Sequence, residues 1–324
     1  MKFQFKIQSF QTEAAESVVK VFAGQPKHGE SKYRRDIGSE KKLSEDEKIT
    51  RRGYIPISYS ALSEEEKRQV EEEYEAAYRN ADVELSKEQL LKNIRAVQTA
   101  NNIKYSPELV AGLGVASLDI EMETGTGKTY VYIKTMFELH KTYGWSKFIV
   151  VVPSIAIREG VKKSFEITQE HFMELYGLKA RFFVYNSSNL HQLDEFSQNS
   201  GINVMIINTQ AFNTTMNEEK NVEGRSGNEA ARIIYTKRDE FGSRRPIDVI
   251  KANRPIIILD EPQKMGGAAT QNALKKNFSP FVFAELFGNT QKPHITLCTF
   301  LTHWTLSKRS WLKNSKSRAL NLKI

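Results

Sequence analysis

The sequence of 324 residues predicts an α/β fold in which helices cover both faces of a parallel sheet. Three observations predict this fold. Residues 115–130 pass from an alternating apolar strand through a Gly-rich turn into a helix with apolar periodicity. Residues 255–263 contain a buried-type apolar strand that ends in two carboxylates. Between these stretches strands and helices alternate, an order that places the strands parallel in one sheet.

The first stretch has the chemistry of a phosphate-binding loop. Gly125 and Gly127 let the backbone turn its N–H groups toward a polyphosphate, and the helix that follows adds positive potential at its N-terminus. Lys128 is placed to reach the β- and γ-phosphates, and the Thr129 hydroxyl is placed to ligate Mg²⁺. One position departs from the usual pattern, because Met122 stands where a glycine is expected five residues before Gly127. The alternative is a Gly-rich turn with a chance Lys-Thr pair. The candidate nucleotide-binding residues of this loop are Thr124, Gly125, Thr126, Gly127, Lys128 and Thr129.

The second stretch supplies two acidic side chains at the end of a strand. Parallel strands present their carboxyl ends to the ligand crevice of an α/β sheet. Asp260 is therefore placed to hold Mg²⁺ through water, and Glu261 to orient and deprotonate the water that attacks the γ-phosphate. The alternative is a solvated strand end.

Together the two stretches carry a family resemblance. Residues 123–129, Glu-Thr-Gly-Thr-Gly-Lys-Thr, and residues 260–263, Asp-Glu-Pro-Gln, resemble the motifs of the first RecA-like domain of superfamily 2 helicases. The Pro-Gln ending resembles the Res subunit of type III restriction–modification enzymes, and the resemblance covers about residues 1–280. It implies a RecA-like three-layer domain, ATP and Mg²⁺ as cofactors, catalytic roles for Lys128 and Glu261, and a coupling role for Gln263. It also implies movement along double-stranded DNA, a methyltransferase (Mod) partner subunit, and a nuclease domain far downstream.

Composition sets outer limits on the class of protein. Lys and Arg number 47 against 39 Asp and Glu, and this diffuse charge of +8 favours a polyanionic partner without identifying one. No apolar run approaches the roughly 20 residues that span a bilayer, so we expect no membrane segment. The N-terminus lacks the apolar core of a signal peptide. The single cysteine, Cys298, fits a reducing cytoplasm.

The N-terminal 25 residues predict a short strand followed by an amphipathic helix, with Phe10 and Gln11 at the turn between them. The resemblance implies that a glutamine here reads the adenine edge, since an amide can both donate and accept hydrogen bonds. Gln11 matches that position, and Gln8 is the substitute. An ordinary exposed glutamine is the alternative.

Residues 26–110 differ from the rest of the chain in composition and are rich in charged residues. We expect an inserted and largely helical segment, with an acidic helix near residues 64–75 and a second helix beginning near Ser86. The basic pairs at 34–35 and 51–52 could touch DNA phosphates, or they could belong to a solvated charged face.

Three residues after later strands are candidates for DNA contact. Ser154 and Arg158 follow the apolar strand 148–152 and resemble the helicase turn that touches the nucleic-acid backbone. A hydroxyl, helix N-terminal amides and a guanidinium all suit phosphate oxygens. Thr209 follows the strand 203–208 and matches the next DNA-contacting turn of the family. The alternative for the first pair is a simple turn between a strand and a helix.

The sequence shows no helix or strand periodicity after about residue 281. Two of the three Trp and the only Cys fall there, and the Ser-Ala-Thr motif that the resemblance implies is absent. Residues 286–292 admit codons that, read one base later, give Tyr-Ser-Ala-Thr-His-Lys. We hypothesise that residues from roughly 280 onward are an out-of-frame translation, which the nucleotide sequence of the gene tests. A genuine divergent tail is the alternative.

These observations give one organisation and two rival functions. We expect residues 1–25 and 111–280 to form the RecA-like ATP-binding domain, residues 26–110 to form a charged helical insertion, and residues 281–324 to be an aberrant tail. The chain as given shows no second RecA-like domain, so we expect it to bind nucleotide, hydrolyse it poorly and leave DNA uncut. The rivals are another superfamily 2 DNA or RNA helicase and an inactive nucleotide-binding fragment.

Overall fold

A seven-stranded sheet forms the centre of the protein. The computed structural model describes residues 5–29, 31–34, 76–109, 116–122, 125–186, 189–209, 234–237, 245–265, 282–287 and 297–301. The strands of the sheet are β3 (Ala116–Met122), β4 (Lys147–Val152), β5 (Arg181–Val184), β6 (Asn203–Asn208), β7 (Ile256–Asp260), β8 (Val282–Phe287) and β9 (Leu297–Leu301). Their order is β5-β6-β4-β7-β8-β3-β9, and all neighbours pair in parallel. The predicted parallel sheet is thus confirmed.

The central strands are apolar along their whole length because both faces are covered. Every residue of β4, β6 and β7 is buried. Side chains of β4 alternate between two cores: Phe148 and Val150 pack into the larger one, and Ile149 and Val151 into the smaller one. This alternation is the three-layer arrangement that the sequence predicts.

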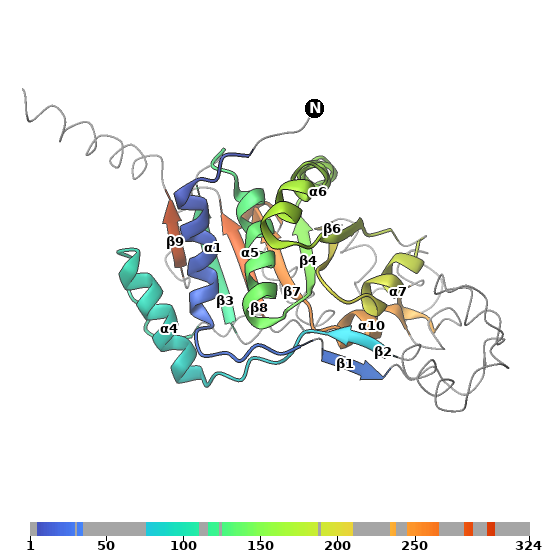
Figure 1. Cartoon of the computed structure of the whole chain (residues 1–324), viewed down its shortest axis with the longest axis horizontal. Helices are drawn as coiled ribbons and strands as arrows, with labels where there is room; N and C mark the ends of the chain where they lie inside the picture. Colours follow the sequence, from blue (N-terminus) through green and yellow to red (C-terminus); the bar gives the residue numbers. More distant parts are fainter. Residues whose placement is uncertain are drawn as a thin grey trace, which may run out of the picture.

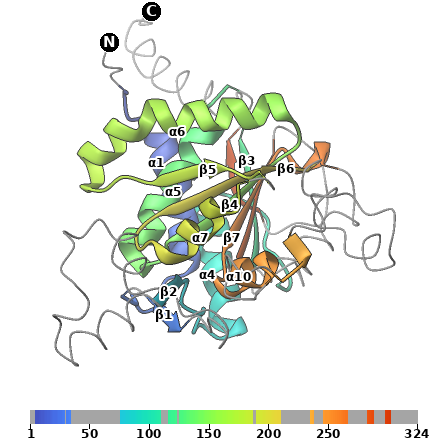
Figure 2. The same cartoon turned by 90° about the vertical axis from the view of Figure 1, so that its right-hand side faces the viewer.

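Helices supply the two outer layers. The larger core is covered by α1 (Ser9–Val21), α4 (Lys87–Ala100), α5 (Lys128–Tyr143) and α6 (Ile155–Tyr176). The smaller core is covered by α7 (His191–Gln198) and α10 (Pro246–Ala252). Figure 1 shows α1 and α5 side by side in front of the strands, and Figure 2 shows α6 crossing above the sheet. No helix among the described residues is long and apolar enough to cross a membrane.

The segment before β3, which we expected to belong to the insertion, contributes a helix to the larger core. The predicted helix near Ser86 is confirmed as α4, whose first turn is capped by the Ser86 hydroxyl accepting from Gln89 N at 3.2 Å. Leu90, Ile94 and Val97 of α4 lie in the larger core. The bounds of the insertion stay a prediction.

A short antiparallel pair also lies in this segment. It consists of β1 (Ser31–Arg34) and β2 (Ala76–Arg79), so the described part of the insertion is not wholly helical. The acidic helix predicted near residues 64–75 lies outside the described residues. Of the two basic pairs, only Arg34 lies within a described element, β1.

Asn80, directly after β2, joins two strand starts. Its Oδ1 accepts from the backbone N of Ser146 (2.7 Å) and of Lys147 (2.9 Å), and its Nδ2 donates to the carbonyls of Lys147 (2.8 Å) and Arg254 (2.9 Å). The side chain is 1% exposed, so these bonds replace water entirely. Asn80 therefore joins the N-terminal ends of β4 and β7, at the ends of the strands opposite the predicted site.

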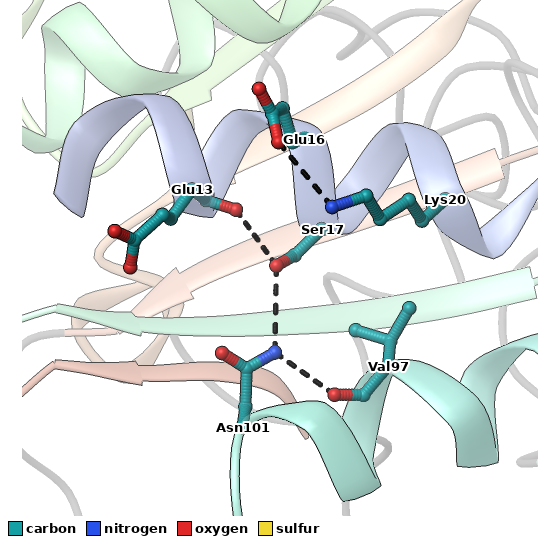
Figure 3. A network of polar contacts seen from close by, with 6 residues as sticks. All are labelled: Glu13, Glu16, Ser17, Lys20, Val97 and Asn101. Atoms are coloured by element: carbon teal, nitrogen blue, oxygen red, sulfur yellow. Dashed lines mark hydrogen bonds and ion pairs between the residues drawn. The ribbon is translucent and has the colours of Figure 1, made fainter. Parts of the chain in front are cut away.

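Polar side chains also join α4 to α1 (Figure 3). Asn101, after the end of α4, donates to Ser17 Oγ at 3.5 Å and to the Val97 carbonyl at 2.9 Å, while Ser17 donates to the Glu13 carbonyl at 2.8 Å. Asn93 donates to the carbonyls at the end of α1, Val21 at 3.0 Å and Ala23 at 2.8 Å. These bonds give the polar backbone at the end of α1 partners from α4.

The two ends of the chain depart from expectation. Residues 5–8 form no strand, and Gln11 lies inside the first turn of α1, not before it. The sheet continues beyond residue 280, where we expected the domain to end, because β8 pairs with both β7 and β3. The origin of residues 281–324 is a question about the gene and stays a hypothesis.

Candidate nucleotide-binding site

The Gly-rich loop joins β3 to α5, as predicted. Gly125 and Gly127 have φ of +84° and +89°, a region that side chains with a Cβ rarely adopt. A Cβ on Gly127 would lie 2.5 Å from Gln11 Nε2, so the Gln11 amide would have to shift to accommodate one. Gly127 is the N-cap of α5, which begins at Lys128. Thr124 lies outside the described residues.

Lys128 and Glu261 form an ion pair at the centre of the site. Lys128 Nζ lies 2.9 Å from Glu261 Oε1, and the two side chains are only 11% and 15% exposed. Glu261 has φ 60° and ψ 53°, a left-handed conformation that is costly for a residue with a side chain. The sequence separates these residues by more than 130 positions, and the parallel sheet brings them together at the carboxyl ends of β3 and β7.

Two further residues hold the Glu261 carboxylate. Gln263 Nε2 donates to Glu261 Oε2 at 2.6 Å, and Lys264 Nζ lies 3.5 Å from the same oxygen. Burial by itself would raise the pKa of Glu261, but the ion pairs with Lys128 and Lys264 outweigh it and the pKa is lowered. Glu261 is therefore a carboxylate at neutral pH. Lys264 was missed in the sequence, although its spacing of three residues from Glu261 is a usable signal.

Asp260 has the opposite electrostatic environment. Its burial, and then the neighbouring charge of Glu261, raise its pKa to about 6, against the influence of Lys128 and Tyr132. Tyr132 on α5 is buried beside Thr129 and Asp260, and burial followed by the charge of Asp260 raises its pKa. Its position three residues after Thr129 places both on one helix face, which is a signal that sequence reasoning did not use.

Buried polar atoms at this site fit a phosphate and a metal ion. Within the described part of the chain, Gln263 Oε1 is buried with no hydrogen-bond partner, and Lys128 Nζ has only its ion pair. Such atoms are costly unless a ligand satisfies them. Thr129 and Asp260 offer the oxygen donors that Mg²⁺ prefers, and Lys128 offers a cation for phosphate oxygens.

Gln11 reaches the loop from α1. Its Nε2 donates to the Thr126 carbonyl at 2.9 Å, so the side chain lies at the loop as predicted. The bond fixes one end of the amide and leaves its carbonyl oxygen as an acceptor. Adenine recognition by Gln11 stays a prediction.

The DNA-contact candidates meet at the neighbouring strand ends. Ser154 caps α6 by accepting from Ile157 N at 3.3 Å, and Arg158 in its first turn lies 2.9 Å from Glu159. The Thr209 hydroxyl donates to the Pro153 carbonyl at 3.2 Å and the residue is 6% exposed. Thr209 thus joins the ends of β6 and β4, a structural use that the sequence did not reveal. Contact of these residues with DNA stays a prediction.

Comparison with known proteins identifies the family. The family described as "Type III restriction enzyme, res subunit" matches residues 88–286, more than half of the chain. The chain belongs to this family. The match begins inside α4 and ends inside β8, so it covers the loop, the carboxylates and the strand beyond residue 280.

Individual relatives agree with the family match. The chain is 31% identical over 202 residues to the Escherichia coli EcoP15I Res subunit, with 57% of this chain and 19% of that protein covered. It is 32% identical over 197 residues to the EcoPI Res subunit of Escherichia phage P1, with the same shares covered. The StyLTI Res subunit of Salmonella typhimurium is 34% identical over 167 residues, 46% of this chain and 16% of that protein. The chain therefore aligns with about a fifth of the length of its Res relatives.

Proposed function

We propose that this chain binds ATP with Mg²⁺ and is the nucleotide-binding motor domain of a type III restriction Res subunit. The observation that carries the proposal is the ion pair between Lys128 and Glu261 beside a glycine loop and a buried carboxylate. In the full-length protein, hydrolysis would drive movement along double-stranded DNA that the Mod subunit helps to recognise. The names of the relatives, Res subunits of restriction–modification enzymes, support this wider role.

Each residue has a chemical task in this proposal. Lys128 exchanges its ion pair with Glu261 for the β- and γ-phosphate oxygens. Released from Lys128, the Glu261 carboxylate would accept a proton from the attacking water. Thr129, and Asp260 through water, would hold Mg²⁺, which would neutralise charge on the phosphates. Gln263 keeps Glu261 in place through its hydrogen bond of 2.6 Å.

Nucleotide binding to the whole chain tests the proposal. Calorimetric titration with Mg²⁺ and a non-hydrolysable ATP analogue compares the wild type with Lys128→Ala. Lys162→Ala is the matched control, since that lysine is 46% exposed on α6 and pairs only weakly with Glu166 at 3.9 Å. We expect Lys128→Ala to lose at least about tenfold in affinity and the control to lose none. Equal affinities in all three proteins would refute the assignment.

DNA binding is tested separately through its salt dependence. Arg158→Ala is compared with Lys163→Ala, which removes the same charge from an exposed position on the same helix. If Arg158 contacts a phosphate, its loss should lower the slope of log affinity against log salt by about one. Identical slopes for the two variants would remove Arg158 from the interface.

A further inference from the structure

A buried lysine on α5 has no role in the site described above. Lys134 is 5% exposed, and its Nζ donates to the Thr12 hydroxyl of α1 at 2.6 Å. Among the described residues, this is the hydrogen bond that holds the ammonium. Burial lowers the pKa of Lys134, although the charges of Glu138 on α5 and Glu16 on α1 act to raise it. An ammonium group is far costlier to bury than an apolar side chain of similar length, which points to a task beyond packing.

Thr12 lies next to the residue that touches the Gly-rich loop. Gln11 precedes it in the first turn of α1, and Gln11 Nε2 donates to the Thr126 carbonyl at 2.9 Å. The same nitrogen lies only 2.5 Å from the place that a Cβ on Gly127 would take, so the amide rests closely against the loop. Thr12 therefore connects Lys134 to the turn of α1 that carries Gln11.

These contacts close a ring between α5 and the loop that precedes it. The helix begins at Lys128, directly after the loop, and reaches Lys134 within about two turns. From Lys134 the ring runs through Thr12 and Gln11 of α1 and returns to the loop at Thr126. Figure 1 shows α1 and α5 side by side. The ring fixes the amide, the loop and the start of α5 with respect to one another.

We propose that Lys134 is a positioning residue of the nucleotide site, acting through Thr12 and Gln11. Its ammonium holds the first turn of α1 against α5, and the Gln11 amide in turn holds the Thr126 carbonyl. The loop is then already ordered when a nucleotide arrives, so less conformational entropy is lost on binding. The inference rests on the proposed nucleotide-binding function and adds a residue that acts on the loop without touching the ligand.

A double-mutant cycle in the full chain tests the proposal. Calorimetric titration measures the affinity for Mg²⁺ with a non-hydrolysable ATP analogue in the wild type, Lys134→Met, Gln11→Ala and the double variant. Met has a similar length and removes the ammonium, so the core stays filled. We expect each single variant to bind at least about fivefold more weakly, and the double variant to bind no more weakly than Gln11→Ala. Lys141→Met removes a charge from an exposed position of α5 and should change nothing.

Substitutions at Thr12 separate positioning from packing. Thr12→Val keeps the shape of the side chain and removes the acceptor of Lys134, whereas Thr12→Ser keeps the hydroxyl and removes a methyl group. We expect Thr12→Val to weaken nucleotide binding about fivefold and Thr12→Ser to stay within about twofold of the wild type. A role in packing alone predicts the opposite order, since Val fills the space that Ser leaves empty.

The outcomes distinguish this inference from the proposed function. Losses that multiply in the double variant, or single variants that bind as tightly as the wild type, overturn Lys134 as a positioning residue and leave the proposed function intact. Weaker binding in Thr12→Ser than in Thr12→Val overturns it as well. A wild type that does not bind the nucleotide overturns the proposed function and the inference with it. Titrations are run well below the melting temperature of each variant, measured by circular dichroism, so that a loss of affinity does not come from unfolding.

Discussion

Replacing Glu261 by Gln should tighten nucleotide binding while abolishing hydrolysis. In the structure the Glu261 carboxylate forms an ion pair with Lys128, the cation that would otherwise bind a phosphate. At 2.9 Å and an effective dielectric constant of about 20, the gross attraction is about 6 kcal/mol. Most of that is offset by the desolvation of two side chains that are 11% and 15% exposed, which leaves a net value of about 1–2 kcal/mol. Removing this competitor corresponds to about a tenfold gain in affinity.

The assay must separate binding from turnover. Titration of Mg–ADP, which is not hydrolysed, into the wild type and Glu261→Gln measures affinity alone. Gln263→Ala serves as a partial perturbation, because it removes the 2.6 Å bond to Glu261 and leaves the ion pair. We expect the tightest binding in Glu261→Gln and an intermediate value in Gln263→Ala. Binding in Glu261→Gln that is equal to or weaker than the wild type would show that the ion pair does not compete with phosphate.

Three other perturbations have outcomes fixed by the same structure. Asn80→Ala should lower the free energy of unfolding by about 3 kcal/mol, because it removes four buried hydrogen bonds to backbone groups; urea denaturation measures this, with Asn101→Ala as the milder comparison. The raised pKa of Asp260, about 6 against about 3.9 in an unfolded chain, favours the folded state below pH 4, and this contribution is lost as pH rises through 6. Between pH 4 and 7, without metal, the free energy of unfolding of the wild type should thus fall by up to about 3 kcal/mol relative to that of Asp260→Asn. Parallel dependences of the two unfolding free energies on pH would contradict the raised pKa of Asp260. Gly127→Ala should weaken nucleotide binding at least about tenfold and lower the melting temperature, whereas Gly160→Ala, where a Cβ meets nothing within 4 Å, should raise it slightly.

The arrangement of the site was predictable because it depends on backbone topology. A strand, a glycine turn and a helix fix where Lys128 begins α5, and a run of apolar residues fixes where β7 ends. In a parallel sheet the carboxyl ends of these strands lie on the same side, so the two motifs can be placed together without information on side-chain contacts. The ion pair at 2.9 Å is a consequence of that topology, although its length could not be deduced.

Side-chain amides and one buried lysine were the part that sequence patterns could not place. Asn80 lies in a stretch that looks like a charged insertion, yet it makes four buried hydrogen bonds to strand starts far away in the sequence. An amide carries no periodicity, and its partners depend on how distant segments pack. The same holds for Lys134 and Thr12, which sequence reasoning did not connect. Thr209 shows the converse, since the motif did not reveal that its hydroxyl donates to the Pro153 carbonyl, and its contact with DNA stays a prediction.

The end of the domain shows why motif loss and fold loss are different observations. The change in composition and the missing Ser-Ala-Thr motif placed the boundary at residue 280, but a strand needs only a short extended segment and a neighbouring strand to pair with. Residues 282–287 satisfy that requirement, because β8 pairs with β7 on one side and β3 on the other. These two neighbours carry the two halves of the nucleotide site, so β8 sets the spacing between the Gly-rich loop and the carboxylates. A chain cut at residue 280 would lose that spacing, and measurements of nucleotide binding therefore belong on the chain that includes β8.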